Sequence, residues 1–387
     1  MTGIGAGDGL WLMSGWIANF KEAKMRKETS YLSKVWLYVG LAIALGAFSP
    51  MHAQVGAPKY EVDPTWPKPL PGTLVTGRAG GICVDAQDHV FEVNRGDLQD
   101  KEKLVATPAP PVLEYDSDGN MVNSFGDFKT APSYIHGCFV DKENNVWVGG
   151  NDDAIVQKYT HDGSKLLLQI GTKGVFDSST GLITGIAMNQ SHTLLNKPAG
   201  IAVDPSSGDV YIADGYGDHR IAVFDKSGKF LRQWGRQGTK DEAAAGDGGA
   251  FMGVVHCVVM DNSGLVYVCD RQGNRIQVFD KMGSFKKSIW IKSGNEETPD
   301  SWGTAWWLAF SRDPAQRFMY VADGRNELVH ILDRESGKEL AKFGRPGHQI
   351  GEFTHCHTMD VDSKGNIYVA ETDIGRRVQK FRIVNSR

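Results

Sequence analysis

The sequence contains no block of basic residues and no segment in which lysine or arginine alternates with aromatic residues, so it lacks the usual marks of a nucleic-acid-binding protein. Its 42 Lys and Arg residues are nearly balanced by 46 Asp and Glu residues, with a formal net charge of -4. It also has no long segment with the hydrophobic period of about 3.6 residues that marks an amphipathic helix, which argues against a helical solenoid. We therefore expect a globular protein without a nucleic-acid partner.

Cysteine is scarce, and the residues present include no Cys-x-x-Cys pair. The five are Cys83, Cys138, Cys257, Cys269 and Cys356. An odd number without paired spacing does not indicate a disulfide framework, so we expect the core to hold together without one. Cys257 and Cys356 are expected to pack in that core.

No hydrophobic run is long enough for a comfortable membrane span, since the run at 35–48 has only fourteen apolar or small residues. It follows a basic stretch and precedes SPMHAQ, an arrangement typical of a secretory signal cleaved near Ala53. We interpret residues 1–53 as an N-terminal extension with a secretory signal, in which Met25 begins a more conventional signal than Met1. The mature protein is expected to be periplasmic or extracellular, with no stable membrane span after cleavage.

What the sequence does contain is an internal repeat. Each copy combines a short apolar run, an aspartate, a polar turn and an alternating aromatic or β-branched run, which is the pattern of a β-hairpin. The six copies are GGICVDAQDHVFEVN, HGCFVDKENNVWVGG, AGIAVDPSSGDVYIAD, HCVVMDNSGLVYVCD, LAFSRDPAQRFMYVAD and HTMDVDSKGNIYVAE. Their aspartates are Asp85, Asp141, Asp204, Asp261, Asp313 and Asp362.

A third strand and a turn follow the hairpin in most copies, so each unit has room for four short strands. Six such units predict an all-β fold, a six-bladed β-propeller over residues 57–387. The last copy stops after its third strand, VQKFRIV, and KYEVDPTW near residue 60 is the expected outer strand that closes this blade. Long inserts are expected to form loops at the mouth of the propeller, at 98–112, 172–197 and 236–252.

Histidine occupies every second unit at one position of the repeat. The residues five positions before the hairpin aspartates are Gly80, His136, Ala199, His256, Leu308 and His357. Because one level of alternate blades repeats about every 120° around the axis, the three imidazoles can meet there. Three protein ligands with an open fourth position are typical of catalytic zinc, although imidazole also suits copper, iron and nickel. The alternative is a water-filled channel lined by histidines without metal.

Side chains just after the second strand of each unit should stand at the same rim as the histidines, because the first two strands are antiparallel. They are Arg95, Tyr216, Arg271 and Arg325, and His355 is expected above the metal as a further contact. Arginines beside a dication would bind a carboxylate, and the positive charge would favour the phenolate of a tyrosine that acts as a base. Alternatively, Arg271 and Arg325 are exposed loop residues paired to neighbouring carboxylates.

Two arginines and two tryptophans are expected to have structural roles or to line the pocket. Arg220 and Arg275 open the third strand in a recurring D-x-x-x-x-R-I pattern and are expected to be structural. Trp306 and Trp307 are expected to wall the pocket or to pack in the core.

The segments GRPGHQIGEFTHCHTMDVDSKGNIYVAE and DRQGNRIQVF resemble NHL repeats. Together with NRGDL, IHG and DGYGDHRI, they make the chain similar to the exported, bacterial-type lyase domain of peptidyl-α-hydroxyglycine α-amidating lyases, which are six-bladed NHL propellers. The resemblance implies zinc on His136, His256 and His357. It also implies that Tyr216 is the catalytic base and that Arg95 and Arg271 bind the substrate carboxylate.

The chain departs from the family pattern at two positions. Thr358 follows the last histidine where the family has an acidic residue that helps to hold a structural calcium, and a hard dication prefers a carboxylate. Gly217 stands beside Tyr216 where the family has a cysteine. Calcium is therefore a weaker expectation than zinc.

The function implied is a zinc-dependent cleavage of the C-N bond in a carbinolamide such as an N-acyl- or peptidyl-α-hydroxyglycine, giving an amide and glyoxylate. The expected partner is a small-molecule or peptide substrate that carries a carboxylate. Two alternatives remain: a metal-dependent lactonase or ester hydrolase on the same propeller, and a non-enzymatic NHL binding propeller.

Overall fold

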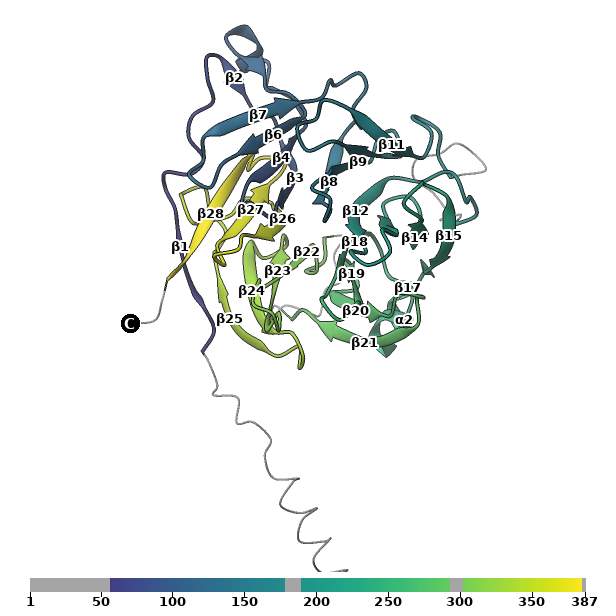
Figure 1. Cartoon of the computed structure of the whole chain (residues 1–387). Helices are drawn as coiled ribbons and strands as arrows, with labels where there is room; N and C mark the ends of the chain where they lie inside the picture. The colour runs from purple at the N-terminus through teal and green to yellow at the C-terminus, as the bar shows by residue number, and fades with distance from the viewer. Residues whose placement is uncertain (1–55, 178–188, 293–301, 385–387) are drawn as a thin grey trace, which may run out of the picture. The chain divides into compact units, whose positions relative to one another are not determined.

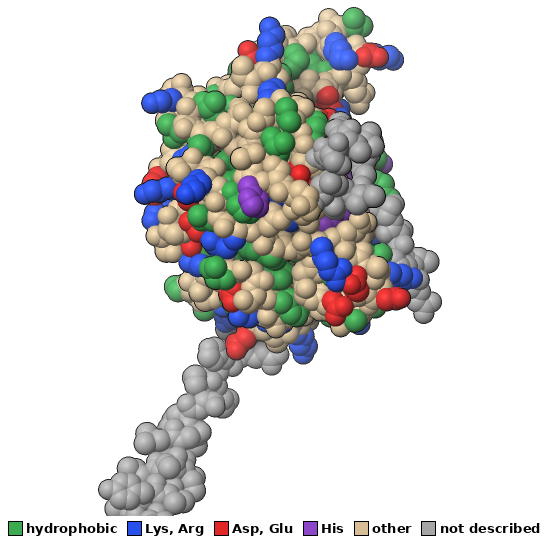
Figure 2. Space-filling view, turned by 90° about the vertical axis from the view of Figure 1, so that its right-hand side faces the viewer, with side chains coloured by type: hydrophobic (Ala, Val, Ile, Leu, Met, Phe, Trp, Pro, Cys, Tyr) green, Lys and Arg blue, Asp and Glu red, His purple; other side chains and the backbone are tan. Residues whose placement is uncertain are grey.

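The structure is a computed structural model that describes residues 56–177, 189–292 and 302–384. The expected secretory signal lies outside these residues. The described chain forms six four-stranded antiparallel sheets around a common axis, together with two small two-stranded pairs (Figure 1). The first strand of each sheet lies nearest the axis and packs against the first strands of the two neighbouring sheets, which closes the ring. The expected all-β, six-bladed β-propeller is confirmed. Positively and negatively charged side chains are interspersed over the face drawn in Figure 2.

In the first three blades the strands follow one another along the chain from the axis to the rim. Blade 1 consists of β3 (Ala79–Val84), β4 (Val90–Asn94), β6 (Val112–Tyr115) and β7 (Met121–Phe125). Blade 2 consists of β8 (Ile135–Val140), β9 (Val146–Gly150), β10 (Ile155–Tyr159) and β11 (Leu166–Ile170). Blade 3 consists of β12 (Pro198–Val203), β13 (Val210–Asp214), β14 (Arg220–Phe224) and β15 (Phe230–Trp234).

The other three blades repeat this order, except that the last one takes its outer strand from the N-terminal side of the chain. Blade 4 consists of β18 (Val255–Met260), β19 (Val266–Asp270), β20 (Arg275–Phe279) and β21 (Phe285–Trp290). Blade 5 consists of β22 (Trp307–Phe310), β23 (Phe318–Asp323), β24 (Leu328–Asp333) and β25 (Glu339–Phe343). Blade 6 consists of β26 (Cys356–Val361), β27 (Ile367–Glu371), β28 (Arg377–Val384) and β1 (Lys59–Val62).

The closing strand is the one expected from KYEVDPTW. β1 pairs antiparallel with β28, with Lys59 opposite Val384 and Val62 opposite Phe381. Tyr60 of this strand also donates a hydrogen bond to the hydroxyl of Tyr320 in blade 5, at 2.8 Å. Because β1 covers the outer edge of β28, the last blade has the same four strands as the others.

The repeated aspartates hold the tight turns between the first two strands. Oδ1 of Asp141 accepts a hydrogen bond from the backbone N-H of Asn145 at 2.9 Å, and Oδ1 of Asp362 accepts one from Asn366 at 2.8 Å. An aspartate that caps its own turn in this way fixes the hairpin locally. The strand before it then lies between two blades and is buried over its whole length in blade 1 and blade 3.

Two of the inserts contain secondary structure that the sequence analysis expected as loops. The first contains η1 (Glu102–Leu104) and β5 (Thr107–Pro108), which pairs with β2 (Leu74–Val75). The third contains β16 (Arg236–Gln237), α2 (Lys240–Ala245) and β17 (Ala250–Phe251). A capping box between Thr239 and Glu242 explains why α2 begins where it does. Within the described ranges, the helices are all too short to traverse a bilayer.

The expectation of a core without disulfides is wrong. Cys83 and Cys138 form a disulfide that joins β3 to β8, and Cys257 and Cys269 form one that joins β18 to β19. Sequence spacing gave no sign of the first pair, because the two cysteines belong to neighbouring blades and only the packing of β3 against β8 brings their Cα atoms to 5.5 Å. Cys356 is unpaired and buried, as expected for a core residue.

Candidate metal centre

The three histidines lie at bulges in the innermost strands. The strand pairing between β8 and β9 shifts register between Ile135 and Gly137, which leaves His136 as the extra residue. The same shift surrounds His256 in β18 and His357 in β26. A β-bulge leaves its extra residue unpaired and redirects the side chain. The bulges therefore explain how a strand that packs between two blades can still turn one side chain toward the axis.

Glycine allows the innermost strands to approach each other at this level. A Cβ atom on Gly137 would lie 2.3 Å from the carbonyl oxygen of Ala199 in the next blade, and one on Gly81 would lie 2.4 Å from the carbonyl oxygen of His136. Any larger residue would force these strands apart. The glycine that follows His136 is thus part of what brings the three rings together.

The structure brings the three rings to one point on the axis, as the repeat register predicted. The centroids of His136 and His357 are 4.5 Å apart, those of His136 and His256 are 4.7 Å apart, and those of His256 and His357 are 5.1 Å apart. One nitrogen of each ring lies within 4.8 Å of the others, and Nε2 of His136 is 3.1 Å from Nε2 of His357. All three side chains are buried.

Backbone carbonyls fix the protonation of two of the rings. Nδ1 of His136 is 3.2 Å from the carbonyl oxygen of Ala199, and Nδ1 of His256 is 2.6 Å from that of Trp306. A carbonyl only accepts, so Nδ1 of each ring carries the proton and Nε2 directs its lone pair toward the centre. Nδ1 of His357 is buried without a hydrogen-bond partner among the described residues.

Burial lowers the pKa of all three histidines well below the usual value, and the nearby guanidinium of Arg95 lowers it further. The rings are therefore neutral at physiological pH, which is the state that binds a metal ion. Three converging lone pairs repel one another unless a cation or a proton lies between them. The donor set thus fits a transition-metal ion, with three imidazoles from alternate blades and further coordination positions open.

Tyr216 lies directly beside the triad. It belongs to the loop between β13 and β14, and its hydroxyl is 3.2 Å from Nε2 of His136 and 3.0 Å from Nε2 of His256. Burial raises the pKa of Tyr216, although the guanidiniums of Arg271 and Arg95 act in the opposite direction. In the protein chain alone desolvation outweighs these two arginines, so the expected phenolate depends on the further positive charge of a metal ion.

The loop of Tyr216 leaves no space for a larger residue at position 217. A Cβ atom on Gly217 would lie 2.1 Å from Cγ of Asn196. Asn196 is itself fixed, because its backbone N-H donates to Oδ1 of Asp214 at 2.7 Å. The departure from the family pattern at Gly217 thus has a steric reason in this chain.

Arg95 and Arg271 both lie against this pocket and are held by aromatic rings. The guanidinium of Arg95 is 3.7 Å from the ring centre of Tyr134, and its Nη1 donates to the hydroxyl of Thr372 at 2.9 Å. That of Arg271 is 4.6 Å from the ring centre of Trp306. Among the described residues, neither guanidinium has a carboxylate partner, although Arg271 is only 8 % exposed and its Nε has no hydrogen-bond partner. Two such cations favour an anionic ligand.

The remaining residues expected at this rim divide between pocket and core. The ring of Trp306 lies 5.5 Å from that of His256 and walls the pocket, whereas Trp307 packs in the hydrophobic core. His355 has a ring centroid 5.2 Å from that of Trp306, and its Nδ1 lies 3.3 Å from a carboxylate oxygen of Asp373. Arg325 makes none of these described contacts with the triad or with the tyrosine.

Tyr134 and Thr372, two residues that hold Arg95, carried no recognisable signal in the sequence. Tyr134 precedes β8 and has a positive φ of 45°, so the alternation of side chains along a strand could not have indicated its direction. Thr372 directly follows β27, at the position of the rim residues in the other blades. Its neutral side chain gave no chemical signal.

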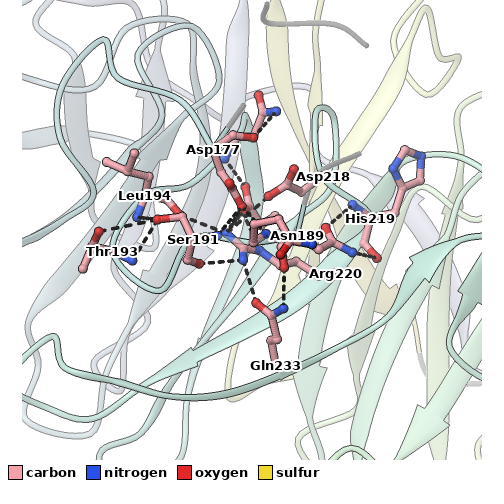
Figure 3. A network of polar contacts seen from close by, with 12 residues as sticks. Asp177, Asn189, Ser191, Thr193, Leu194, Asp218, His219, Arg220 and Gln233 are labelled. Atoms are coloured by element: carbon pink, nitrogen blue, oxygen red, sulfur yellow. Dashed lines mark hydrogen bonds and ion pairs between the residues drawn. The ribbon is translucent and has the colours of Figure 1, made fainter. Parts of the chain in front are cut away.

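Arg220 and Arg275 are structural, as expected. Arg220 is fully buried, and its Nη2 lies 2.9 Å from Asp214, 3.2 Å from Asp177 and 3.2 Å from Asp218. Figure 3 shows these side chains converging on the guanidinium. Nε of Arg275 lies 2.8 Å from a carboxylate oxygen of Asp270, and both side chains are buried.

The network around Arg220 supports the loop that carries Tyr216. Its Nη1 donates to the carbonyl oxygen of Ser191 and its Nη2 to that of Leu194, both at 2.8 Å, so the insert before β12 is tied to β14 (Figure 3). Burial, followed by the charge of Asp214, raises the pKa of Asp218 to about 9. Asp218 is therefore protonated at neutral pH. This protonation reduces the negative charge of the three carboxyl groups that surround Arg220.

Comparison with known proteins agrees with the architecture. The model of the NHL repeat matches residues 195–224 and 254–279. The chain is thus a six-bladed β-propeller that carries NHL repeats, with a buried three-histidine cluster on its axis.

Among curated proteins, the chain is 27% identical to human NHL repeat-containing protein 3 over 344 residues, covering 84% of this chain and 85% of the relative. It is 26% identical over 317 residues to peptidyl-alpha-hydroxyglycine alpha-amidating lyase 1 of Drosophila melanogaster, covering 78% of this chain and 52% of the relative. It is also 26% identical over 335 residues to mouse peptidyl-glycine alpha-amidating monooxygenase, covering 81% of this chain and 31% of the relative.

The chain therefore spans about half of the fly lyase and about a third of the mouse monooxygenase. A solved structure of a streptogramin B lyase superposes with a TM-score of 0.54 at 10% identity, covering 84% of this chain and 98% of that one, which supports the fold alone. The relatives are homologues of the propeller, and they include amidating lyases.

Proposed function

We propose that the protein is a zinc-dependent carbon-nitrogen lyase that cleaves an N-acyl- or peptidyl-α-hydroxyglycine-like carbinolamide to an amide and glyoxylate. One observation carries the proposal. The hydroxyl of Tyr216 lies within 3.2 Å of two Nε2 atoms of the triad and of Nη1 of Arg271. A metal site, a proton acceptor and an anion site thus meet at one atom, which is the combination that this reaction requires.

His136, His256 and His357 would hold the zinc ion. A zinc ion held there supplies Lewis acidity, which lowers the pKa of a substrate hydroxyl and of the adjacent Tyr216 phenol. The three imidazoles are already neutral and two of them are fixed as the Nδ1-H tautomer, so binding needs no tautomer change in those two rings.

Other residues of the chain would bind the substrate and accept its proton. Arg95 and Arg271 would bind the substrate carboxylate, and the nearly buried guanidinium of Arg271 would gain the anionic partner that the described residues do not give it. The oxygen of Tyr216 would accept the proton of the carbinol hydroxyl. The C-O bond then becomes a carbonyl while the C-N bond breaks, and the electron pair of that bond leaves with the amide nitrogen, which takes up a proton.

Trp306 would exclude water from this site. Its ring packs against the guanidinium of Arg271 and lies 5.9 Å from the ring of His357. A drier pocket strengthens both the carboxylate-guanidinium contact and the effect of the metal charge.

The proposal includes export of the protein. Two disulfides in the described chain support an oxidising compartment, in line with the secretory signal interpreted from the sequence. The substrate would then be a small molecule or a peptide that carries a carboxylate and reaches the protein outside the cytoplasm.

The test is the release of glyoxylate from N-benzoyl-α-hydroxyglycine by the purified, zinc-loaded protein. The wild type is expected to release glyoxylate and benzamide in equal amounts, whereas Tyr216→Phe should retain the metal and lose about 100-fold or more in kcat. A Tyr216→Phe variant with full activity would refute the scheme. If a lactone or ester were consumed instead, with solvent oxygen entering a new carboxylate, the hydrolase would replace it. A protein without any bound metal would indicate a binding propeller.

A further inference from the structure

A second group of metal-ligating side chains lies at the other end of the innermost strands, where blade 1 meets blade 2. Asp85 follows the end of β3, His89 precedes β4 and Glu114 lies in β6, all in blade 1. His161 comes from the turn after β10 in blade 2. The triad lies where these innermost strands begin, so the two groups occupy opposite ends of the propeller.

Each of the two histidines contacts a carboxylate of this group. Nε2 of His161 is 2.9 Å from Oδ2 of Asp85 and 3.9 Å from Oε1 of Glu114. Nδ1 of His89 is 2.5 Å from Oε1 of Glu114. Ligand atoms of Asp85, His89 and Glu114 all lie within 4.8 Å of one another. Asp85, His89 and Glu114 therefore direct ligand atoms into one small volume, and His161 contacts the two carboxylates from beside it.

In three of the other five blades, the second carboxylate oxygen of the hairpin aspartate pairs with a permanent cation. Oδ2 of Asp141 is 3.0 Å from Nζ of Lys158, and that of Asp204 is 2.6 Å from Nζ of Lys281. That of Asp261 is 2.6 Å from Nη1 of Arg334. In blade 6 the buried Asp362 is held instead by hydrogen bonds from Asn366 and Tyr368. In blade 1 an imidazole takes the place of the lysine or arginine.

The carboxylates of blade 1 are nevertheless as buried as the others. The side chain of Asp85 is 0 % exposed and that of Glu114 is 5 % exposed. Among the described residues, their ion-pair partners are His161 and His89 alone, and Asn123 adds one hydrogen bond to Oε2 of Glu114 at 3.2 Å. Two buried carboxylates without a permanent cation are costly, and a divalent ion compensates both at once.

We propose that Asp85, His89, Glu114 and His161 bind a divalent transition-metal ion of the zinc class. Mixed imidazole and carboxylate ligands suit such ions better than calcium or magnesium, which prefer oxygen alone. His89 and His161 are 33 % and 30 % exposed, so an ion can enter from solvent.

The role of this second site is to join two blades. Its ligands come from blade 1 and from the neighbouring turn of blade 2, the same two blades that the Cys83–Cys138 disulfide connects through their innermost strands. A metal ion that binds only the folded ring stabilises it by mass action. The proposal does not rest on the proposed lyase activity.

The test is the zinc content of tag-free, full-length protein, measured by plasma mass spectrometry after equilibration with zinc and removal of free ion. His89→Gln/His161→Gln should bind one ion fewer per chain than the wild type. Glu114→Gln changes a single charge and keeps the shape of the side chain. If the double variant does not fold, Glu114→Gln should still bind one ion fewer than the wild type. Lys158→Gln is the matched control, because it removes the permanent cation of the next blade and should leave the zinc content unchanged.

A melting experiment separates a structural site from surface binding. In a protein whose triad is removed by His136→Ala, His256→Ala and His357→Ala, zinc should still raise Tm, and a chelator should reverse the effect. The same addition should leave Tm unchanged once His89 and His161 are also replaced by glutamine. Equal zinc content in the wild type and the blade 1 variants would overturn the proposal. A Tm that responds to pH but not to zinc would also overturn it, because imidazolium would then be the cation.

Discussion

Nη1 of Arg271 lies 3.2 Å from the hydroxyl oxygen of Tyr216, and the same guanidinium covers the ring of Trp306. The arginine follows the second strand of blade 4 and the tyrosine follows the second strand of blade 3, so the repeat places them at one rim. The hydroxyl of Tyr216 also contacts two imidazoles of the triad. The proposed anion-binding arginine and the proposed proton acceptor are therefore in direct contact. The contact between Arg271 and Tyr216 is the point from which the chemistry of the pocket can be tested.

Arg271→Lys should raise KM for a carboxylate-bearing substrate by about 10- to 100-fold, because a lysine cannot form the paired hydrogen bonds of a guanidinium. The measurement is steady-state kinetics of glyoxylate release. Arg325→Lys is the matched control, since Arg325 also follows the second strand of its blade and makes none of the described contacts with the triad. Equal kinetics for the two variants would show that Arg271 does not bind substrate.

Asp218→Asn should stabilise the protein at pH 8 by at least about 1 kcal/mol, while Asp214→Asn should destabilise it. The pKa of Asp218 is raised to about 9 in the folded protein, so between about 4 and 9 the folded state binds a proton that the unfolded state has lost. The stability contributed by this group is complete below about pH 4 and declines as the pH rises toward 9. Asparagine imitates the protonated acid and removes that decline.

Urea unfolding across this pH range measures the effect. A wild type and an Asp218→Asn variant with parallel pH profiles would contradict the assignment. Asp214→Asn serves as the comparison, because this carboxylate is the nearest partner of Arg220, at 2.9 Å.

One free thiol is expected per chain when the protein is denatured without reductant, and five after reduction. The single thiol is Cys356, which is buried in the native state and should react only after unfolding. Thiol titration with an aromatic disulfide reagent makes this measurement directly. Removing the inter-blade bond by Cys83→Ala/Cys138→Ala should cost about 2–4 kcal/mol. Three or five free thiols before reduction would contradict the disulfide assignment.

Gly217→Ala should lower both stability and activity, because the new methyl group would meet the side chain of Asn196. The expected loss of stability is about 1–3 kcal/mol. Gly217→Ala/Asn196→Ala should recover part of it by removing the opposing atoms. An alanine variant with unchanged melting temperature and kcat would show that the loop has more freedom than the structure indicates.

The repeat predicted most of the architecture because its aspartates fix the hairpins locally, as Asp141 and Asp362 do. Counting back from those aspartates located His136, His256 and His357 on one level. The bulges that turn the three rings inward could not be predicted, because a bulge is defined by strand pairing rather than by one residue type.

Other features depended on contacts between blades. The Cys83–Cys138 bond and the approach of Tyr134 to Arg95 exist only when blades 1 and 2 pack together. The arginines beside Tyr216 were visible in the sequence, whereas the burial that raises the pKa of its phenol in the chain alone was not.

The central claim is that three imidazoles from alternate blades share one ion, and the most direct measurement is an anomalous difference map at the zinc edge from crystals of the zinc-loaded protein. The account predicts a peak on the propeller axis with nitrogen atoms of His136, His256 and His357 at about 2.0–2.1 Å from it. A map without density among these three rings, from protein that binds zinc only elsewhere, would contradict it.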